Sequence, residues 1–431
     1  MRCRRFTHLP VLAVGASFVV GGLVAAGPVA AQEAAAVAPD SADQSANARG
    51  TIAAIPDSAS TETGIRIGHG DKGFEFETAD GRYLLQLQAR LQFRVSYPFE
   101  SDPVTFEKFE GEDELSFAVR RARLKVGGHA FEPWVKYYFE YELASSALLN
   151  FEAKVERWKA LSLHVGQWKV EYNRERMISS GKQQTADRSI LTFPFTIDRQ
   201  QGVSLFGRLS GGGAADFTYA AGVFTGTGRG NTKNDDDVPM FTGRLQWNMF
   251  GAPVPFHGSD LKRHEDPVAI VALAGTTNLS PYTRFSQAGG GQLPGFEEGV
   301  RGQYRVNQGV LETALMWKGF SWQQELHWKE IDDRVNGKTT RLIGNYVQAG
   351  YFFGELWSFV PPQLELAGRH AFYDPDRDVE DDFRHEVTVA TNWFFHGHLN
   401  KLTAEISYLD LEEGAAERDG TRFRLQWDVS F

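Results

Sequence analysis

The stretch YLLQLQARLQFRV, residues 83–95, alternates between two kinds of side chain. Its odd-numbered positions are all apolar, and its even-numbered positions from Gln86 onward carry only glutamine or arginine. Successive side chains of a β-strand point to opposite faces, so this pattern predicts a strand with one apolar face and one wet face. A turn signal at residues 79–82, ADGR, precedes the strand.

The same two-sided pattern recurs along the rest of the chain. Each run is about long enough to cross a bilayer as a tilted strand, and the total of about sixteen is even, as bacterial outer-membrane barrels require. The predicted strands are 83–97, 114–127, 134–143, 148–158, 161–170, 201–210, 215–225, 238–250, 267–278, 306–318, 320–330, 340–353, 362–373, 383–395, 400–409 and 421–431.

The connections between these strands differ in length. Short ones at 129–133, 159–160, 210–214, 319 and 396–398 interleave with long polar ones at 98–113, 171–198, 278–299 and 374–382. Short turns on the periplasmic side and long loops outside are the asymmetry expected of an outer-membrane barrel.

Strands that are apolar on one face and charged on the other fit a barrel in lipid, because only helices and closed sheets pair all their backbone groups in hydrocarbon. The alternative is a large soluble β-sandwich or propeller. Against it stand the absence of a blade repeat and the aromatic residues near strand ends, which are typical of interfacial girdles. These are Trp134, Trp158, Trp168, Trp357 and Trp393. We predict an all-β fold, a transmembrane antiparallel β-barrel over residues 73–431.

The N-terminal residues predict export. Residues 1–31 combine three arginines, an apolar stretch and a small-residue end, which is typical of a cleaved signal peptide. Residues 32–72 are largely poor in large apolar side chains and predict a disordered periplasmic linker. Cys3, the sole cysteine of the sequence, would leave with the signal, so thiol chemistry is excluded. Losing the three arginines changes the net charge from −10 to −13, which disfavours a nucleic-acid partner.

The last predicted strand ends on Phe431, after Phe423, Leu425, Trp427 and Val429 on one face. A C-terminal strand that ends in phenylalanine resembles the signal by which the outer-membrane assembly machinery recognises its clients. We therefore expect Phe431 to be the assembly signal, and the outer membrane, with its lipid bilayer and lipopolysaccharide, to be the protein's location.

Three stretches carry a resemblance to a known family. FAVRRARLKVGG at 117–128, VGQWKV at 165–170 running into ERMISS at 175–180, and DRQQGV at 198–203 resemble the phosphate-selective porins of the O and P type. The likeness extends over most of residues 73–431. It implies a sixteen-stranded water-filled channel for small hydrophilic solutes, usually a homotrimer, with residues 171–198 as an inward-folded constriction loop. It also implies basic residues that guide anions such as phosphate or polyphosphate.

Twelve basic residues are candidates for lining the pore and binding anions, because guanidinium and ammonium groups bind phosphate oxygens. They are Arg90, Arg94, Arg121, Arg123, Lys125, Lys136, Arg174, Arg176, Lys182, Arg188, Arg199 and Arg244. Glutamates such as Glu140, Glu325 and Glu405 also fall on inward faces, so ion pairs that brace the wall are an alternative. The segment 171–198 balances four basic against four acidic side chains. A general or cation-tolerant porin without phosphate selectivity therefore stays open.

Other chemistries are disfavoured. Asp374-x-Asp376-x-Asp378 opens like a calcium loop, but Val379 stands where glycine is needed for the sharp turn, and His396-x-His398 offers only two ligands. We therefore expect neither a metal nor a cofactor. An enzyme in the barrel would need a nucleophile beside a base, and neither His164 nor His327 has a sequence-evident serine partner. A plugged structural barrel would have to satisfy the many inward charges internally.

Overall fold

The computed structural model describes residues 64–103, 105, 109, 114–286, 290–414 and 416–431. The predicted signal peptide and residues 32–63 of the predicted linker lie outside this part. The strands are β1 (Ile65–Gly70), β2 (Gly73–Thr78), β3 (Leu84–Tyr97), β4 (Ser116–Ala130), β5 (Glu132–Glu142), β6 (Ala147–Trp158), β7 (Leu161–Lys169), β8 (Arg199–Ser210), β9 (Asp216–Phe224), β10 (Met240–Asn248), β11 (Val268–Ser280), β12 (Tyr304–Trp317), β13 (Phe320–Asp333), β14 (Lys338–Tyr351), β15 (Leu364–Asp374), β16 (Arg384–His396), β17 (Asn400–Glu413) and β18 (Ala416–Ser430). Short helices are α2 (Arg174–Met177), η1 (Ser180–Lys182), α3 (Thr192–Phe195) and η2 (Phe353–Glu355).

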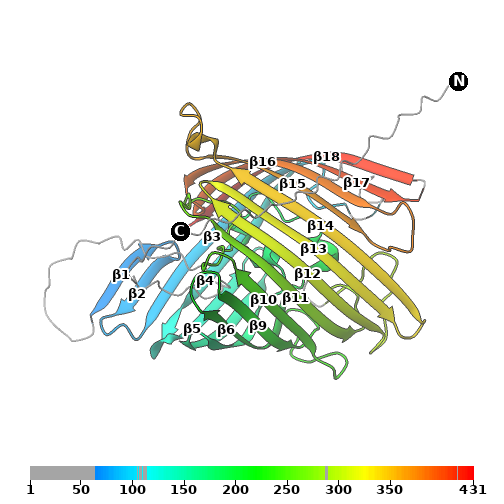
Figure 1. The fold of residues 1–431 in the computed structure, drawn as a ribbon, viewed down its shortest axis with the longest axis horizontal. Helices are drawn as coiled ribbons and strands as arrows, with labels where there is room; N and C mark the ends of the chain where they lie inside the picture. Colours follow the sequence, from blue (N-terminus) through cyan, green and yellow to red (C-terminus); the bar gives the residue numbers. More distant parts are fainter. Residues whose placement is uncertain (1–63, 104, 106–108, 110–113, 287–289, 415) are drawn as a thin grey trace. The chain divides into compact units, whose positions relative to one another are not determined.

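Strands β3 to β18 form a closed antiparallel barrel of sixteen strands (Figure 1). Each pairs with the next along the chain, and β18 returns to β3 with a register from Phe423↔Tyr97 to Ser430↔Arg90. Phe431 extends this seam. Its backbone N–H donates to Ala89 O at 3.0 Å, and its carbonyl oxygen accepts from Ala89 N at 2.8 Å. The predicted fold is confirmed, and every one of the sixteen predicted segments overlaps one barrel strand.

The alternation in sequence becomes two faces of the barrel wall. On β3, Gln92 is fully buried inside while its neighbour Phe93 is 40% exposed on the outer face. The outer face is apolar because its side chains face the hydrocarbon of the membrane. The closed sheet leaves no unpaired backbone edge there. Tryptophans gather near the ends of strands that run into turns, as an interfacial belt does. This belt includes Trp158, Trp247, Trp317, Trp393 and Trp427. Trp168 was expected in the belt but is fully buried in the inner cluster, so that expectation is wrong. In the described ranges, no helix is both long and apolar enough to cross a membrane.

The predicted linker is too long at its C-terminal end. Residues 65–70 form β1, which pairs with β2 through a tight turn at Asp71 and Lys72. β2 in turn pairs with β3 over Leu84–Leu87, the part of β3 that β18 does not reach. Gly73 makes this possible. Its φ is +83°, and a Cβ at this position would lie 2.2 Å from Leu87 O, so only glycine fits. Composition did not reveal this hairpin, since its stability comes from backbone pairing to the barrel.

The short connections that follow β4, β6, β8, β12 and β16 lie at one end of the barrel, which we call the turn end. Two other connections at this end are longer than a simple alternation of loops and turns predicts. Residues 249–267 join β10 to β11, and residues 352–363 join β14 to β15. The first brings Val254, Ser259 and Asp260 into buried positions in the barrel. At the opposite end, by contrast, β5–β6 and β13–β14 are joined by only four residues each, 143–146 and 334–337. Part of the first connection therefore fills the lumen, so its length is not set by the side of the membrane alone.

Candidate channel and its basic wall

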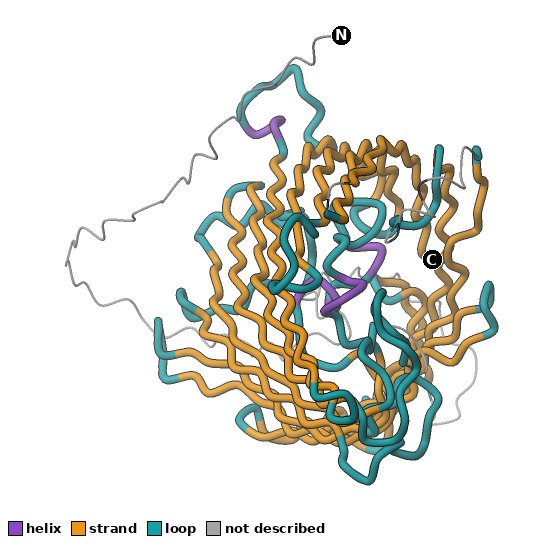
Figure 2. The backbone as a smooth tube through the Cα atoms, turned by 90° about the vertical axis from the view of Figure 1, so that its right-hand side faces the viewer, coloured by secondary structure: helices purple, strands orange, loops and turns teal. Residues whose placement is uncertain are grey.

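Residues 171–198, the connection between β7 and β8, lie inside the barrel. Figure 2 shows helices of this segment, and loops, within the ring of strands. Trp168, Ile178 and Phe195, in and beside this loop, are fully buried. The chain turns inward because aromatic and aliphatic side chains at its two ends pack against the inner wall.

One side of the lumen holds this loop through a row of glutamates on β12, β13, β15, β16 and β17. Each carboxylate accepts hydrogen bonds from amide groups of the loop, including Arg174 N to Glu312 (3.1 Å) and Glu175 N to Glu325 (2.6 Å). The others are Gln184 Nε2 to Glu365 (2.7 Å), Ala186 N to Glu405 (2.7 Å) and Ile190 N to Glu386 (2.9 Å). The acidic side of the wall is thus covered by the loop, and its charges are used to hold that loop.

The second inward segment, residues 249–267, meets the loop from the turn end. Gly258 N donates to Lys182 O at 2.7 Å, and Lys182 Nζ lies 3.0 Å from His257 Nε2. Arg174 donates to Val254 O at 3.3 Å and lies over the Phe256 ring. These contacts hold the loop from the turn end, in addition to the glutamates that hold it from the wall.

The other side of the lumen stays open. Between the loop and strands β3–β6 lies a cavity of about 320 Å³, which we call the basic chamber. Its basic lining residues are Lys72, Arg90, Arg123, Lys125, Lys136, Lys154, Lys169 and Lys182, and its acidic ones are Asp71, Glu140, Glu152 and Glu156. The lining therefore contains eight basic groups against four acidic ones, an arrangement that favours anions.

Five of the twelve predicted site residues line this chamber. Arg90 donates to Asp428 at 3.1 Å and Ser179 at 3.2 Å, and Arg123 to Glu140 and Glu142 at 2.7 Å each. Lys125 donates to Gln88 at 3.0 Å, Lys136 to Glu156, and Lys182 reaches His257. Both the anion-guiding interpretation and the wall-bracing one therefore have counterparts in the contacts.

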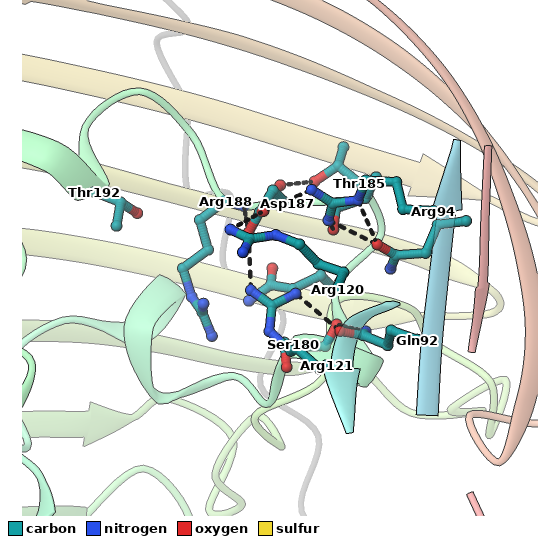
Figure 3. Close-up of polar contacts among 12 residues, drawn as sticks. Gln92, Arg94, Arg120, Arg121, Ser180, Thr185, Asp187, Arg188 and Thr192 are labelled. Atoms are coloured by element: carbon teal, nitrogen blue, oxygen red, sulfur yellow. Dashed lines mark hydrogen bonds and ion pairs between the residues drawn. The ribbon is translucent and has the colours of Figure 1, made fainter. Parts of the chain in front are cut away.

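Two further predicted residues, Arg94 and Arg121, converge on Asp187 of the loop (Figure 3). Arg94 approaches Asp187 Oδ2 at 3.1 Å, and Arg121 approaches Oδ1 at 3.4 Å. A third guanidinium, that of Arg120, lies 3.6 Å from Oδ2. Burial raises the pKa of the Asp187 carboxyl, but Arg121, Arg94 and Arg120 outweigh it and hold this pKa well below its usual range.

Sequence reasoning missed Arg120. Strict alternation that starts from the inward-facing Arg121 and Arg123 places Arg120 on the outer face. In the structure the register of β3 and β4 shifts between Gln92 and Phe93, so Gln92 pairs with Arg121 and Phe93 with Val119. Arg120 is the extra residue of this β-bulge, and a bulge re-aims its side chain. The run Arg120-Arg121 was the available signal, since one member had to leave the alternation to avoid lipid.

The remaining five predicted residues do not line the basic chamber, and their side chains make contacts within the loop or between the loop and the wall. Arg174 and Arg176 bind Pro255 O and Asp198 respectively. Arg188 donates to Glu175 O (2.9 Å) and Ile178 O (2.7 Å) within the loop. Arg199 donates to Asn150 (2.6 Å), and Arg244 holds both oxygens of Glu312 at 2.8 Å. They support the loop because a buried carboxylate or carbonyl needs a donor.

We expect Asp187→Asn to strengthen phosphate binding at this arginine cluster. The change removes the carboxylate that Arg94, Arg120 and Arg121 share, so their donors become available to anion oxygens. Losing one opposing charge is worth on the order of 1.4 kcal/mol, which is about tenfold in affinity. The phosphate concentration that halves the chloride current should fall by that factor.

Asp237→Asn is the matched control, since it removes the same charge from a side chain that is 86% exposed in an outer loop. Equal half-blocking concentrations in the two variants would contradict the prediction that phosphate binds at this cluster.

In the described part of the chain, no three His, Cys, Asp or Glu side chains are grouped as metal ligands would be. His396 and His398 are joined by an isolated backbone bridge in a turn. His164, considered above as a base, lies between Glu152 (3.3 Å) and Glu171 (3.5 Å) and stacks on Trp168. The cluster ties the loop's first residues to β6 and β7.

A closed sixteen-stranded barrel with an apolar outer face, a charged inner face and an inward loop defines an outer-membrane porin. Its place is the bacterial outer membrane. A sequence profile of the family described as phosphate-selective porin O and P matches residues 90–428, and the chain belongs to this family. No curated protein matches the chain.

Solved porins share the fold at low sequence identity. A loop-deletion mutant of OmpT from Vibrio cholerae is 10% identical, with a TM-score of 0.55 over 81% of this chain and 100% of that one. An anion-selective porin from Comamonas acidovorans is 11% identical, with a TM-score of 0.52 over 80% and 99%. The outer membrane channel DcaP of Acinetobacter baumannii is 10% identical, with a TM-score of 0.51 over 83% and 99%.

Proposed function

We propose that this porin conducts small inorganic anions, phosphate among them, along the wall formed by β3–β6. The observation that carries the proposal is the division of the lumen. Glutamates on β12–β17 are covered by the loop that they bind, while the basic chamber on the other side is open to solute. A passing ion therefore meets an excess of lysine and arginine. Passage is passive diffusion, and we assign no catalytic role to the barrel.

Membership of the phosphate-selective family and the fold shared with an anion-selective porin both support this charge preference. Phosphate preference also follows from the donor chemistry of the site. Arg94, Arg120 and Arg121 present planar guanidinium groups from neighbouring positions, and such groups bind phosphate oxygens in pairs.

The second candidate function is a general porin with little charge preference. The contacts that favour it are the ion pairs inside the chamber, Arg123 with Glu140 and Glu142, and Lys136 with Glu156. If these pairs persist during conduction, two of the eight basic side chains of the chamber are neutralised by their partners.

The reversal potential of the purified protein in a planar bilayer under a potassium chloride gradient tests the proposal, repeated with added phosphate. We expect an anion-favouring potential that weakens as salt rises, because exposed charges are screened, and a chloride current that phosphate blocks. An anion-favouring potential without phosphate block would leave anion conduction and remove phosphate binding. A potential near zero, or one that favours cations, would support the general porin instead.

We also propose the export and assembly route that the sequence suggests. Residues 1–31 act as a signal peptide. The outer-membrane assembly machinery recognises Phe431 before the β18–β3 seam closes. The mature barrel contacts lipopolysaccharide in the outer leaflet and assembles as a homotrimer, as the family resemblance implies. Chemical crosslinking of the protein in native membranes tests the trimer.

A further inference from the structure

The connection between β14 and β15 leaves the turn end of the barrel and projects sideways from the wall (Figures 1 and 2). Both views show it standing away from the sheet. We call residues 353–360 the aromatic finger. Its outermost side chains are apolar, with Leu356 64% exposed, Trp357 49% and Phe359 82%.

The finger has a fixed conformation. At its root, Phe352 is fully buried against Phe394, and the Arg263 guanidinium lies 3.5 Å from the centre of the Phe352 ring. Arg263 also donates to Glu355 at 2.8 Å and to Pro362 O at 2.8 Å. Arg263 therefore clamps both arms of the finger to the barrel rim.

The two arms are also close-packed against each other. A Cβ at Gly354 would come within 2.9 Å of Pro362 Cα and 3.0 Å of Val360 O. Backbone hydrogen bonds from Trp357 N to Phe353 O (2.9 Å) and from Val360 N to Trp357 O (3.0 Å) close the turns. The apolar tip is thus held outward by these contacts.

Three rings form a row along the finger. Phe353 and Trp357 stack at 5.3 Å with 16° between their planes, and Trp357 and Phe359 at 6.0 Å with 12°. Leaving a large apolar side chain in water is unfavourable relative to burying it. A rigid row of such side chains, fixed outside the barrel, indicates an apolar environment that covers it.

The aromatic belt of the barrel identifies that environment. Trp317, Trp393 and Phe395 lie at the turn end of β12 and β16 and are 45%, 36% and 58% exposed on the outer face. The finger departs from the same end, between strands of the same wall, so it continues this belt. Aromatic side chains of such belts lie at the level of the lipid headgroups. Lys318, beside Trp317, adds a cation of the kind that pairs with headgroup phosphates.

We propose that the aromatic finger inserts into the periplasmic leaflet of the outer membrane, at the boundary between headgroups and acyl chains. Its partner is phospholipid, and its effect is to anchor this side of the barrel rim at a fixed depth. The finger lies outside the lumen, so the proposal is independent of which ions the channel conducts.

Spin labelling measures this directly. In a Cys3→Ser background, a nitroxide is attached at Phe359→Cys, and the protein is placed in phosphatidylethanolamine–phosphatidylglycerol vesicles. The accessibility of the nitroxide to oxygen and to a water-soluble nickel complex is then compared with that of labels at two reference positions. Phe395→Cys is the lipid-facing reference, and Ala214→Cys, in the exposed β8–β9 turn at the same end, is the aqueous reference. We expect the oxygen-to-nickel ratio at position 359 to match position 395 and to exceed position 214 severalfold, with single-channel conductance unchanged.

A ratio at position 359 equal to that at 214 would overturn the proposal, because it would place the finger in water. Low accessibility to both reagents, with spin–spin broadening between labels, would also overturn it, in favour of a second copy of this chain as the partner. If Phe359→Cys does not fold, Ser358→Cys carries the label, since Ser358 is exposed at the same tip.

Discussion

Exchanging Lys125 and Lys154 for glutamate should reduce the anion-to-cation permeability ratio by about tenfold, since fields focused in a cleft change local ion concentrations by that order. Both residues line the basic chamber, on β4 and β6. The double variant leaves six basic and six acidic side chains around the chamber in place of eight and four. The measurement is the reversal potential in a potassium chloride gradient at low salt.

Lys159→Glu with Lys262→Glu is the matched control, because it changes the net charge equally at two exposed residues of the turn end. We expect that control to keep the anion preference of the unmodified protein. An equal loss in both double variants would mean that overall charge, and not the chamber wall, sets selectivity.

Replacing Arg369 with alanine should release the tip of the loop from the acidic wall and lower the free energy of unfolding by about 3–5 kcal/mol. Its guanidinium donates to Glu386, to Thr185 Oγ1 at 2.7 Å and to Asp187 O at 2.9 Å, and Glu175 lies 3.8 Å away. The substitution leaves two buried carboxylates without this shared cation. Guanidinium unfolding in lipid vesicles, followed by tryptophan fluorescence, measures the loss.

The released loop should also be visible in single-channel recordings as increased current noise. Arg341→Ala is the control, because the Arg341–Glu330 pair at 3.1 Å is partly solvent-exposed, with Arg341 49% exposed, and surface pairs contribute about 0–1 kcal/mol. Equal stability changes at positions 369 and 341 would show that Arg369 does not hold the loop. A stable, quiet Arg369→Ala channel would lead to the same conclusion.

The site could be predicted only in part. Arg90, Arg123 and Lys125 were identified because each occupies an inward position of an alternating strand, and alternation is a local property. Arg120 was missed because a single extra residue in β4 reverses the facing of its neighbours, and the bulge is set by pairing with β3. Arg174 and Arg188 were expected in the pore but are buried, since sequence does not show which basic residues a loop will cover.

The period-two alternation, the even number of strands and the aromatic strand ends determined the barrel from sequence alone. They suffice because in lipid a closed sheet is the one way for such strands to pair all their backbone groups. The path of residues 171–198 across the lumen was decided by tertiary structure. Its bonds, such as Ala186 N to Glu405, join residues 219 positions apart, and no local pattern encodes such a contact. Whether an inward charge binds a loop or faces the solute is therefore decided by which wall the loop covers.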